Sequence, residues 1–397
     1  MSDNVLVINC GSSSLKFALF DIAQEQELIA GLAERLGDEN AQLSWSVNGE
    51  KTKRDISNAD HKAAITAVMV LLKNLGLDGN IKAVGHRVVH GAEVFRDSCI
   101  IEAKTLAAIN DCVPLAPLHN PGNIIGIEAI AAAMPALPQV AVFDTSFHQT
   151  IPKHAYLYPV PYSLYKDHGV RRYGFHGTSH SYVCEQAAIR LEVPLSETAL
   201  LSVHLGNGCS ATAVLGGESQ DTTMGMTPLE GLVMGTRSGN VDPGLHQYLA
   251  DTCGYSLAEI TDLLNKKSGL LGLSELSNDM RELTEAAEAG HEGAILAIDV
   301  FCYQLAKQLA SLTVALGRLD ALVFTGGIGE NAPSIREKTC ALLSIFNVQI
   351  DQQRNGNSGK SSNGFINAEG STPNVLVVST NEELKIALDT ARVCLNG

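Results

Sequence analysis

Residues 5–17 read VLVINCGSSSLKF, and this stretch decides the fold. Its apolar start predicts a buried strand, which ends in a polar turn that begins at Gly11. A second apolar run, FALF at 17–20, follows directly after Lys16. The stretch therefore predicts strand, turn and strand. It differs from a P-loop, which runs from strand through turn to helix and carries a G-x-x-x-x-G-K-[ST] motif that this stretch lacks.

The same order of elements returns at 200–214, where LLSVHL, GNG and CSATAV read as a strand, a Gly-rich turn and a strand. Two such hairpins in the two halves of one chain predict a duplicated domain with a nucleotide between the halves. The alternative is a pair of unrelated hairpins with ordinary polar turns.

The remaining sequence alternates short apolar runs with helical patterns, which is typical of an α/β fold. Strands are expected at 5–9, 82–90, 139–143, 200–205, 321–325 and 375–379. Helices are expected at 103–112, 122–134, 179–191, 244–253, 256–265, 281–289, 292–316 and 382–394. The Gly/Asn/Ser-rich stretch 352–371 is expected to form a surface hairpin or loop, and 150–173 a crossover between domains.

Composition excludes several classes of protein. The 397 residues carry a net charge of −15, which argues against a sequence-independent nucleic-acid binder. No signal peptide is visible, and four polar residues interrupt the apolar stretch 294–316, so we expect a buried helix there and no membrane span. The nine cysteines contain no C-x-x-C pair, which favours a reduced, cytoplasmic protein.

Three Gly-rich turns are candidates for phosphate binding, because backbone amides in such turns can point at anions. The first contains Ser12 and Lys16, and the second is 206–208. The third is GGIGEN at 326–331, which follows an expected strand and precedes a helix expected to begin near 332. Its spacing does not match the G-x-G-x-x-G of a dinucleotide-binding fold.

Several charged residues stand where chemistry is plausible. Arg87 lies within an apolar run and needs an anionic partner, either a structural carboxylate or a substrate. Arg237 lies between glycines, and His176 precedes an expected helix. Two arginines and a histidine suit a phosphoryl group in transfer. Asp144 ends an expected strand, and Glu382 either favours a helix N-terminus or holds Mg²⁺ through water.

Nine strings together resemble the acetate kinase family, in the family's order from residue 5 to residue 384. They are VLVINCGSSSLKF, GHRVVHG, PLAPLHNP, VFDTSFHQT, RRYGFHGTSH, HLGNGCS, MGMTPLEGLVMGTRSG, FTGGIGEN and TNEEL. The resemblance implies the actin/hexokinase/heat-shock-ATPase fold: two duplicated actin-like (ribonuclease H-like) α/β domains with a nucleotide cleft between them. We expect the first at 1–149, with residues 384–397 packed back on it, and the second at 150–383.

The resemblance implies a homodimeric enzyme that reversibly transfers the γ-phosphoryl group of ATP to acetate, giving ADP and acetyl phosphate, with Mg²⁺ or Mn²⁺. It implies catalytic roles for Asp144, His176 and Arg237, and metal ligands at Asn9 and Glu382. The implied substrate-binding residues are Arg87, Val89, Leu118 and Pro228. The expected nucleotide-binding residues are Ser12, Lys16, His204, Leu205, Gly206, Asn207, Gly208, Asp279, Met280, Arg281, Gly327, Ile328, Gly329, Glu330 and Asn331.

Three positions depart from the family's usual pattern: Gly326 replaces an alanine, Asn278 a serine and Asn240 an aspartate. None removes a charged catalytic group. A propionate kinase of the same family, or a non-catalytic nucleotide-gated binder, is the alternative function. Because acetate is already ionised at pH 7, we expect Asp144 to orient the arginines or a metal-bound water, and not to abstract a proton.

Overall fold

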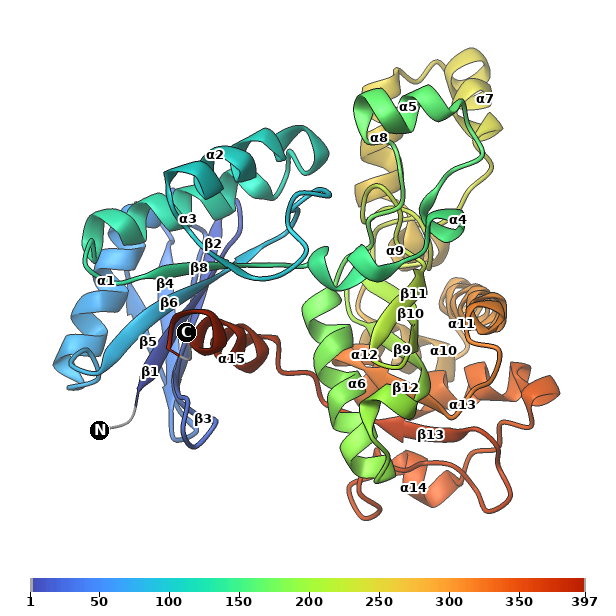
Figure 1. Cartoon of the computed structure of the whole chain (residues 1–397). Coiled ribbons are helices and arrows are strands. Elements are labelled where there is room, and N and C mark those ends of the chain that lie inside the picture. The colour runs from blue at the N-terminus through green and yellow to red at the C-terminus, as the bar shows by residue number, and fades with distance from the viewer. Residues whose placement is uncertain (1–2, 396–397) are drawn as a thin grey trace. The chain divides into compact units, whose positions relative to one another are not determined.

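The structure is a computed structural model that describes residues 3–395, and its contacts divide the chain into two compact units (Figure 1). Unit 1 comprises residues 1–149 and 381–397, and unit 2 comprises residues 150–380. The second boundary lies three residues before the expected one. The reason is helix capping: the side chain of Asn381 accepts a hydrogen bond from the Leu384 amide at the start of the last helix, so the cap belongs with that helix.

Unit 1 is built on a sheet with the strand order β5-β4-β3-β2-β1-β6-β8-β7. Its strands are β1 (Asn4–Cys10), β2 (Ser14–Asp21), β3 (Gln26–Glu34), β4 (Gln42–Val47), β5 (Glu50–Asp55), β6 (Ile81–Val88), β7 (Cys99–Ile100) and β8 (Gln139–Phe143). Its helices are α1 (His61–Asn74), α2 (Ala103–Asp111), α3 (Asn120–Ala133) and α15 (Glu382–Cys394).

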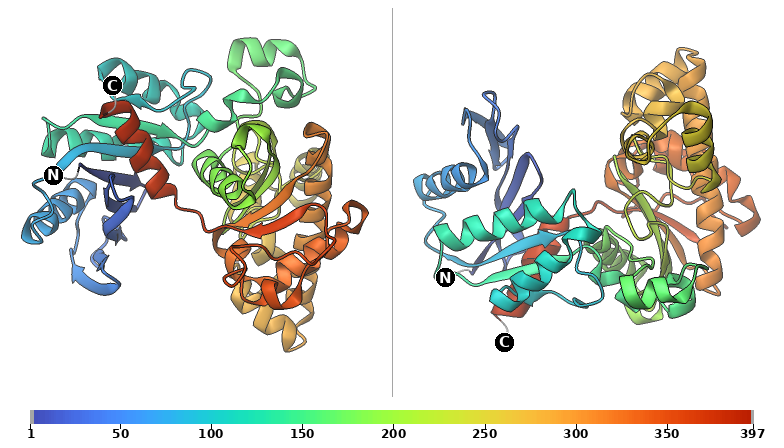
Figure 2. Two further views of the ribbon diagram at one scale, coloured as in Figure 1. Left: turned by 60° about the horizontal axis from the view of Figure 1, so that its bottom comes forward. Right: turned by 90° about the horizontal axis from the view of Figure 1, so that it is seen from above.

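The helices of unit 1 cover both faces of this sheet. Alternate residues of β1 and β6, such as Ile8 and Val84, join a core with α1 and α3. On the opposite face, a Cβ at Gly85 would lie 2.3 Å from Thr390 Oγ1 of α15, so the absent side chain lets that helix approach β6 closely. Helix α15 also packs against β1 and β8, and it can be followed in red in Figure 2. The apolar stripe of 382–394 therefore covers a sheet, as predicted.

Unit 2 is built on a sheet with the order β11-β10-β9-β12-β13. Its strands are β9 (Ala199–Leu205), β10 (Cys209–Leu215), β11 (Glu218–Thr222), β12 (Ala321–Thr325) and β13 (Asn374–Val377). The first three pair antiparallel and the last two are parallel to β9. In unit 1 the strands β3-β2-β1-β6-β8 have the same order and directions. This shared topology confirms the α/β fold with a duplicated domain that the two hairpins predicted.

Helices lie on both sides of the unit 2 sheet, with α6 on one side and α11 on the other (Figure 1). The helices of this unit are α4 (Lys153–Tyr156), α5 (Tyr162–His168), α6 (Gly177–Leu191), α7 (Gly244–Cys253), α8 (Leu257–Lys266), α9 (Gly269–Ser274), α10 (Met280–Glu288), α11 (Glu292–Leu312), α12 (Gly326–Asn331), α13 (Pro333–Leu342) and α14 (Gln352–Gly356).

Helix α11 and the turn after it form the one described segment, Glu292–Ala315, that is long and apolar enough to cross a membrane. The helix packs against α9, α10 and α13, and buries Phe301, Leu305 and Leu309 among them. It is a core helix of unit 2, as predicted. All nine cysteines lie within the described residues and are free thiols.

Two expectations about local structure are partly wrong. The helix expected near 332 is confirmed as α13, which begins at Pro333, but the turn expected at 326–331 is itself a short helix, α12, which begins at Gly326 directly after β12. The polar stretch 352–371 is no simple hairpin, because its first residues form α14, with the side chain of Asp351 accepting a hydrogen bond from the Arg354 amide.

Candidate active site

The two predicted hairpins have matching three-residue turns. In unit 1, the Gly11 amide donates to the Ser14 carbonyl at 2.8 Å, and Ser12 is exposed at the tip. In unit 2, the Gly206 amide donates to the Gly208 carbonyl at 3.0 Å. Each of these two amides is bonded inside its own turn, so a phosphate would have to be bound by the other backbone amides of the turn.

The third turn follows β12 and opens α12. Gly326 has a φ of +77°, and a Cβ there would lie 2.7 Å from the Leu205 carbonyl oxygen, so this chain's departure from alanine fits its backbone. The Glu330 carboxylate accepts hydrogen bonds from the amides of Gly326 and Thr380 at 3.1 and 3.2 Å. Glu330, which was expected to bind the nucleotide, thus ties two backbone segments of unit 2 together.

A carboxylate–arginine cluster lies at the ends of β6 and β8 in unit 1. Arg87 donates two hydrogen bonds to Asp144, from Nε at 3.0 Å and from Nη2 at 2.6 Å. The Glu382 carboxylate lies 3.9 Å from Arg87 Nε. Although burial alone would lower the pKa of Arg87, the charges of Asp144 and Glu382 raise it above its ordinary value. Arg87 is therefore a fixed cation with 22% of its side chain exposed.

The same cluster carries more negative than positive charge. Lys16 pairs with Glu383. The cluster therefore contains three carboxylates, those of Asp144, Glu382 and Glu383, and two cations, Arg87 and Lys16. Burial raises the pKa of Glu382 to about 7, and the nearby carboxylates of Asp144 and Glu383 add to that rise. Carboxylate and amide oxygens suit a hard divalent cation, and Asn9 lies near the end of β1, the strand next to β6 in the sheet.

In unit 2, Gly208 lies beside two of the three predicted catalytic residues. A Cβ placed on Gly208 would lie 3.4 Å from Arg237 Nη2 and 3.5 Å from His176 Nε2. The two side chains therefore reach the same point of the second turn, whereas Arg87 and Asp144 belong to unit 1. His176 has a φ of +57°, which is uncommon for a residue with a Cβ and which is often retained at functional sites.

Arg237 is held by its loop without an opposite charge. Its Nη1 donates to the Pro228 carbonyl at 2.8 Å, and it takes part in no ion pair of residues 3–395. Burial lowers the pKa of Arg237, but a guanidinium stays protonated in proteins. The loop itself is closed by Asn240, whose Oδ1 accepts from the Gly231 amide at 2.8 Å. A half-buried arginine without a carboxylate is a site prepared for an anion.

A cavity of about 950 Å³ opens beside this point, and it is large enough for a nucleotide. Predicted nucleotide-binding residues lining it are Gly206, Asn207, Asp279, Met280, Arg281, Gly327, Ile328 and Asn331. The other predicted nucleotide-binding residues of unit 2 do not line this cavity. They are His204, Leu205, Gly208, Gly329 and Glu330. Asn207 lines the cavity, and Gly208, which Arg237 and His176 reach, follows it in the chain.

Sequence reasoning missed other residues of this lining, namely Asn278, Thr284, Glu285, Glu288, Ala332, Pro333 and Ser334. Part of this set could have been predicted from the sequence. Arg281, Thr284, Glu285 and Glu288 follow a helical period on α10, so the face of that helix could have been extended from Arg281.

The residues expected to bind the substrate belong to both units. Val89, which is 8% exposed, follows β6, and its amide donates to Asn123 Oδ1 at 3.0 Å. Leu118 also belongs to unit 1 and is 68% exposed. Pro228 belongs to unit 2, where its carbonyl accepts from Arg237. Ser12 and Lys16, expected to bind nucleotide, lie in unit 1.

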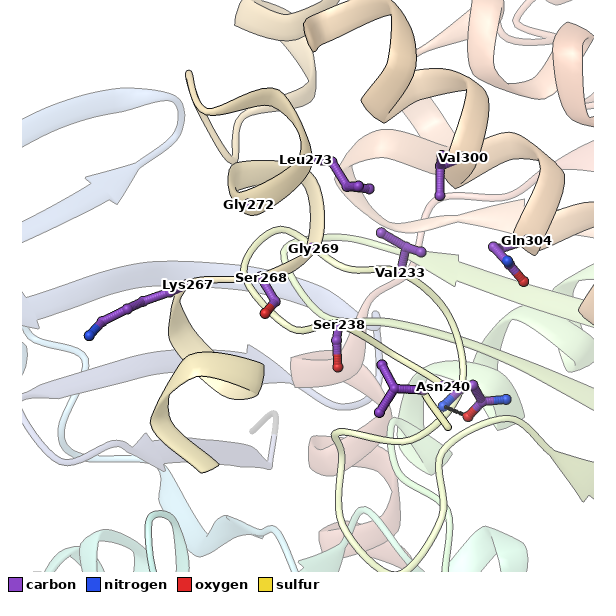
Figure 3. Close-up of a pocket in the computed structure, with 12 residues that line it drawn as sticks. Val233, Ser238, Asn240, Lys267, Ser268, Gly269, Gly272, Leu273, Val300 and Gln304 are labelled. Atoms are coloured by element: carbon purple, nitrogen blue, oxygen red, sulfur yellow. Dashed lines mark hydrogen bonds between the residues drawn. The ribbon is translucent and has the colours of Figure 1, made fainter. Parts of the chain in front are cut away.

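A second cavity, of about 360 Å³, lies on the loop that carries Arg237 (Figure 3). Ser238, Ser268, Gln304 and the aliphatic side chains of Val233 and Val300 line it. The string MGMTPLEGLVMGTRSG contributes Gly231, Val233 and Ser238 to this lining, but no binding role was predicted for them. The cavity shares no lining residue with the larger one.

Comparison with known proteins covers both units. Residues 4–388 match the profile of the Acetokinase family. An acetate kinase of Pseudomonas aeruginosa is 54% identical over 389 residues, which is 98% of each chain. One of Ectopseudomonas mendocina is 55% identical over 387 residues, also 98% of each chain.

Solved structures are similar over the same length. A propionate kinase from Francisella tularensis matches with a TM-score of 0.94 and 46% identity, over 98% of this chain and 100% of its own. An acetate kinase from Porphyromonas gingivalis matches with a TM-score of 0.93 and 42% identity, over 99% of this chain and 100% of its own. The likeness to these two structures therefore covers the fold and also close to half of the side chains.

Proposed function

Because the chain belongs to the acetokinase family, we propose that it transfers the γ-phosphoryl group of ATP to acetate and forms ADP and acetyl phosphate, reversibly. This is the activity of an acetate kinase, a phosphotransferase. The observation that carries the proposal is the placement of Arg237 and His176 at Gly208, next to the cavity of about 950 Å³. A cation without a carboxylate partner beside a nucleotide-sized cavity suits a phosphoryl group whose charge must be stabilised during transfer.

The chemical difficulty of this reaction is repulsion between two anions. Acetate has a pKa close to that of a glutamate side chain, about 4.3, so at neutral pH it is already a nucleophile and needs no base. The bidentate bond from Arg87 occupies both oxygens of Asp144, which supports an orienting role for this carboxylate. Arg87 then binds the acetate carboxylate, or the phosphoryl group as it arrives, with its guanidinium held in one orientation.

Each unit supplies side chains to which the proposal gives a role. Lys16 of unit 1 reaches the nucleotide phosphates, while Arg237 and His176 of unit 2 donate to the oxygens of the transferring group. The transfer is direct and in line, so no phosphorylated enzyme forms. These fixed donors stabilise negative charge without reorganisation at the moment of transfer.

Mg²⁺, or Mn²⁺ in its place, would be held by Asn9 and Glu382. Within residues 3–395, no three His, Cys, Asp or Glu side chains converge to hold a metal by themselves. That finding suits Mg²⁺, which binds one or two protein ligands and takes its others from water and nucleotide phosphates. When bound, the ion would neutralise phosphate charge. The Glu382 carboxylate remains available to a metal ion, because Arg87 lies 2.6 Å from Asp144 and 3.9 Å from Glu382.

Propionate is the second candidate substrate, because a propionate kinase is 46% identical to this chain. We propose acetate as the preferred acceptor, with Val89 limiting the space for a longer chain. One methylene is worth about 1–3 kcal/mol, so propionate should react more slowly and still react. A homodimeric state and a cytoplasmic location are further parts of the proposal.

Trapping of acyl phosphate by hydroxylamine tests this function. Purified protein with ATP, Mg²⁺ and acetate should form acetyl hydroxamate, with propionate giving a lower kcat/KM. The Arg237→Leu variant should bind ADP and form little hydroxamate. Folded wild-type protein that binds ADP and forms no hydroxamate from either acid would point to the non-catalytic nucleotide binder.

A further inference from the structure

A run of hydrogen bonds leads from the core of unit 2 to the predicted catalytic histidine. Ser202 Oγ lies 2.8 Å from His180 Nδ1, and His180 Nε2 lies 2.7 Å from Ser210 Oγ. Ser210 Oγ in turn lies 2.9 Å from His176 Nδ1. Ser202, His180 and Ser210 are fully buried, so water cannot replace any of these partners.

The strand register places these groups on one face. Ser202 and His204 of β9 lie directly opposite Thr212 and Ser210 of β10, so all four side chains point the same way. Helix α6 covers that face and supplies His180. The run is therefore built from two strands and a helix, which are rigid elements.

Counting protons along the run leaves two possible directions. A serine hydroxyl has one proton, so Ser210 can donate to only one of its two histidine partners and must accept from the other. If Ser210 donates to His176 Nδ1, a neutral His176 carries its proton on Nε2. If Ser210 instead donates to His180, the neutral His176 ring carries its proton on Nδ1, and Nε2 has only a lone pair.

One choice of direction fixes every proton of the run, because each serine has one proton and each neutral imidazole has one N–H. In the first direction the Ser202 hydroxyl donates to His180 Nδ1. His180 then carries its proton on Nε2 and donates to Ser210, which donates to His176.

The outer end of the run favours the first direction. His176 Nε2 lies beside Gly208 and close to the point that Arg237 Nη2 reaches. An N–H there can donate to a phosphoryl oxygen, whereas a lone pair would repel it. The His176 ring is held in place by stacking on His204, with ring centroids 4.4 Å apart, and His204 Nδ1 is hydrogen-bonded to Ser179 at 2.8 Å.

We propose that Ser210 and His180 are positioning residues that hold neutral His176 as the tautomer with its proton on Nε2, directed at the transferring phosphoryl group. The proposal rests on the proposed phosphoryl transfer for the choice of direction and for the use of that proton. The tautomer itself is a property of the unliganded protein, and it can be measured without any turnover.

The test combines 15N spectra of histidine-labelled protein with kinetics. In the wild type, His176 Nδ1 should resonate as an unprotonated nitrogen, with assignment from the His176→Gln variant. In Ser210→Ala the Nδ1–H tautomer should become populated. We expect kcat to fall about 10- to 100-fold, the scale for partners that orient a functional histidine, while KM for ATP changes less than about threefold. Ser210→Thr keeps the hydroxyl and should restore both the tautomer and most of kcat.

Two further variants separate this role from packing. Thr212→Val removes a buried hydroxyl from the same face of β10, where it bonds Thr222 at 2.8 Å, outside the run. It should leave the His176 tautomer and kcat unchanged. Ser202→Ala, at the far end, should shift the tautomer in the same direction as Ser210→Ala, but less.

An unchanged His176 tautomer in Ser210→Ala would overturn the proposal, as would equal losses of kcat in Ser210→Ala and Thr212→Val. A wild-type protein that forms no acetyl hydroxamate contradicts the proposed function instead, and the 15N spectra still decide the tautomer.

Discussion

Arg87 and Asp144 form a two-pronged pair in which Nε and Nη2 donate to the two carboxylate oxygens at 3.0 and 2.6 Å. The pair depends on the sheet, because β6 and β8 are parallel neighbours with Arg87 opposite Val142, two residues before Asp144. Asp144 is 2% exposed in its side chain, and Arg87 is 22% exposed. Both carboxylate oxygens of Asp144 therefore hold the guanidinium of Arg87 in one orientation, while the Arg87 side chain stays partly exposed.

Replacement of Asp144 tests whether it orients Arg87 or abstracts a proton. Asp144→Asn keeps the size and removes the charge, and we expect kcat to fall about 10²-fold, the scale of losing one fixed charge interaction. The pH profiles of wild type and variant should stay parallel between pH 6 and 8. Asp97→Asn is the matched control, since Asp97 also accepts two bonds from one arginine, Arg392, but on the surface. A pH-dependent rise in kcat that only the wild type shows would identify Asp144 as a base.

Arg237 is expected to act mainly in the transition state. Arg237→Leu should lower kcat roughly 10²- to 10³-fold or more, because it removes a guanidinium that the Pro228 carbonyl holds in one orientation. Arg237→Lys should recover little, since an ammonium cannot reproduce the guanidinium fork. The control is Arg318→Leu, which removes an exposed arginine of unit 2 that pairs with Asp320. Steady-state kinetics decide the matter, and a loss of less than tenfold in Arg237→Leu would contradict the assigned role.

The cavity of about 950 Å³ can be filled without disturbing the fold. Gly327 lines it, and a Cβ there would meet no atom within 4 Å. Gly327→Leu should therefore fold normally and weaken ADP binding at least about tenfold, equivalent to 1.4 kcal/mol. Gly356→Leu offers the same change on an exposed helical glycine of unit 2, again with nothing within 4 Å. Calorimetric titration with ADP measures both, and equal affinities in the two variants would place the nucleotide elsewhere.

Local patterns in the sequence were sufficient for the hairpins and for several strands. The spans 139–143 and 321–325 match β8 and β12 to the residue, because uninterrupted apolar runs ended by polar residues are characteristic of buried strands. The predicted roles of Asp279 and Arg281 agree with the cavity, since both lie at the start of α10.

Contacts between distant strands could not be read from the sequence in this way. Nothing local states that β6 lies beside β8, so the pairing of Arg87 with Asp144 required the sheet register. Strand β5, EKTKRD, was missed because all six residues are exposed and no alternation marks a buried face. The start of α12 was missed because glycines usually break helices, whereas here the Glu330 carboxylate binds the Gly326 amide.

Acid should destabilise unit 1 through His86. The ring is 2% exposed, and burial lowers its pKa to about 4, although a 2.7 Å hydrogen bond to Gln139 opposes this. The unfolded chain has the ordinary value of 6.5. The neutral ring therefore stabilises the fold fully above pH 6.5, and that stability is lost as the pH falls from 6.5 toward 4. At pH 5 the loss should be about 2 kcal/mol.

Urea unfolding can isolate this contribution, because Trp45, the only tryptophan of the chain, lies in β4 of unit 1 and reports on that unit. His86→Gln removes the titration and keeps a hydrogen-bonding side chain beside Gln139. Its midpoint should fall less than that of the wild type between pH 7.5 and pH 5. Equal acid sensitivity of the two proteins would exclude His86 as the source.

Substrate size should depend on Val89. It lies two residues after Arg87, and the bond of its amide to Asn123 Oδ1 fixes the backbone at the end of β6. If Val89 lines the methyl pocket as proposed, Val89→Ala enlarges that pocket, so the ratio of kcat/KM for propionate to that for acetate should rise about tenfold, within the 1–3 kcal/mol of one methylene. Val94→Ala makes the same change at a position that is 67% exposed, and the ratio should stay constant. If Val89→Ala lowers kcat/KM for both acids by the same factor, the side chain packs the core and does not select the substrate.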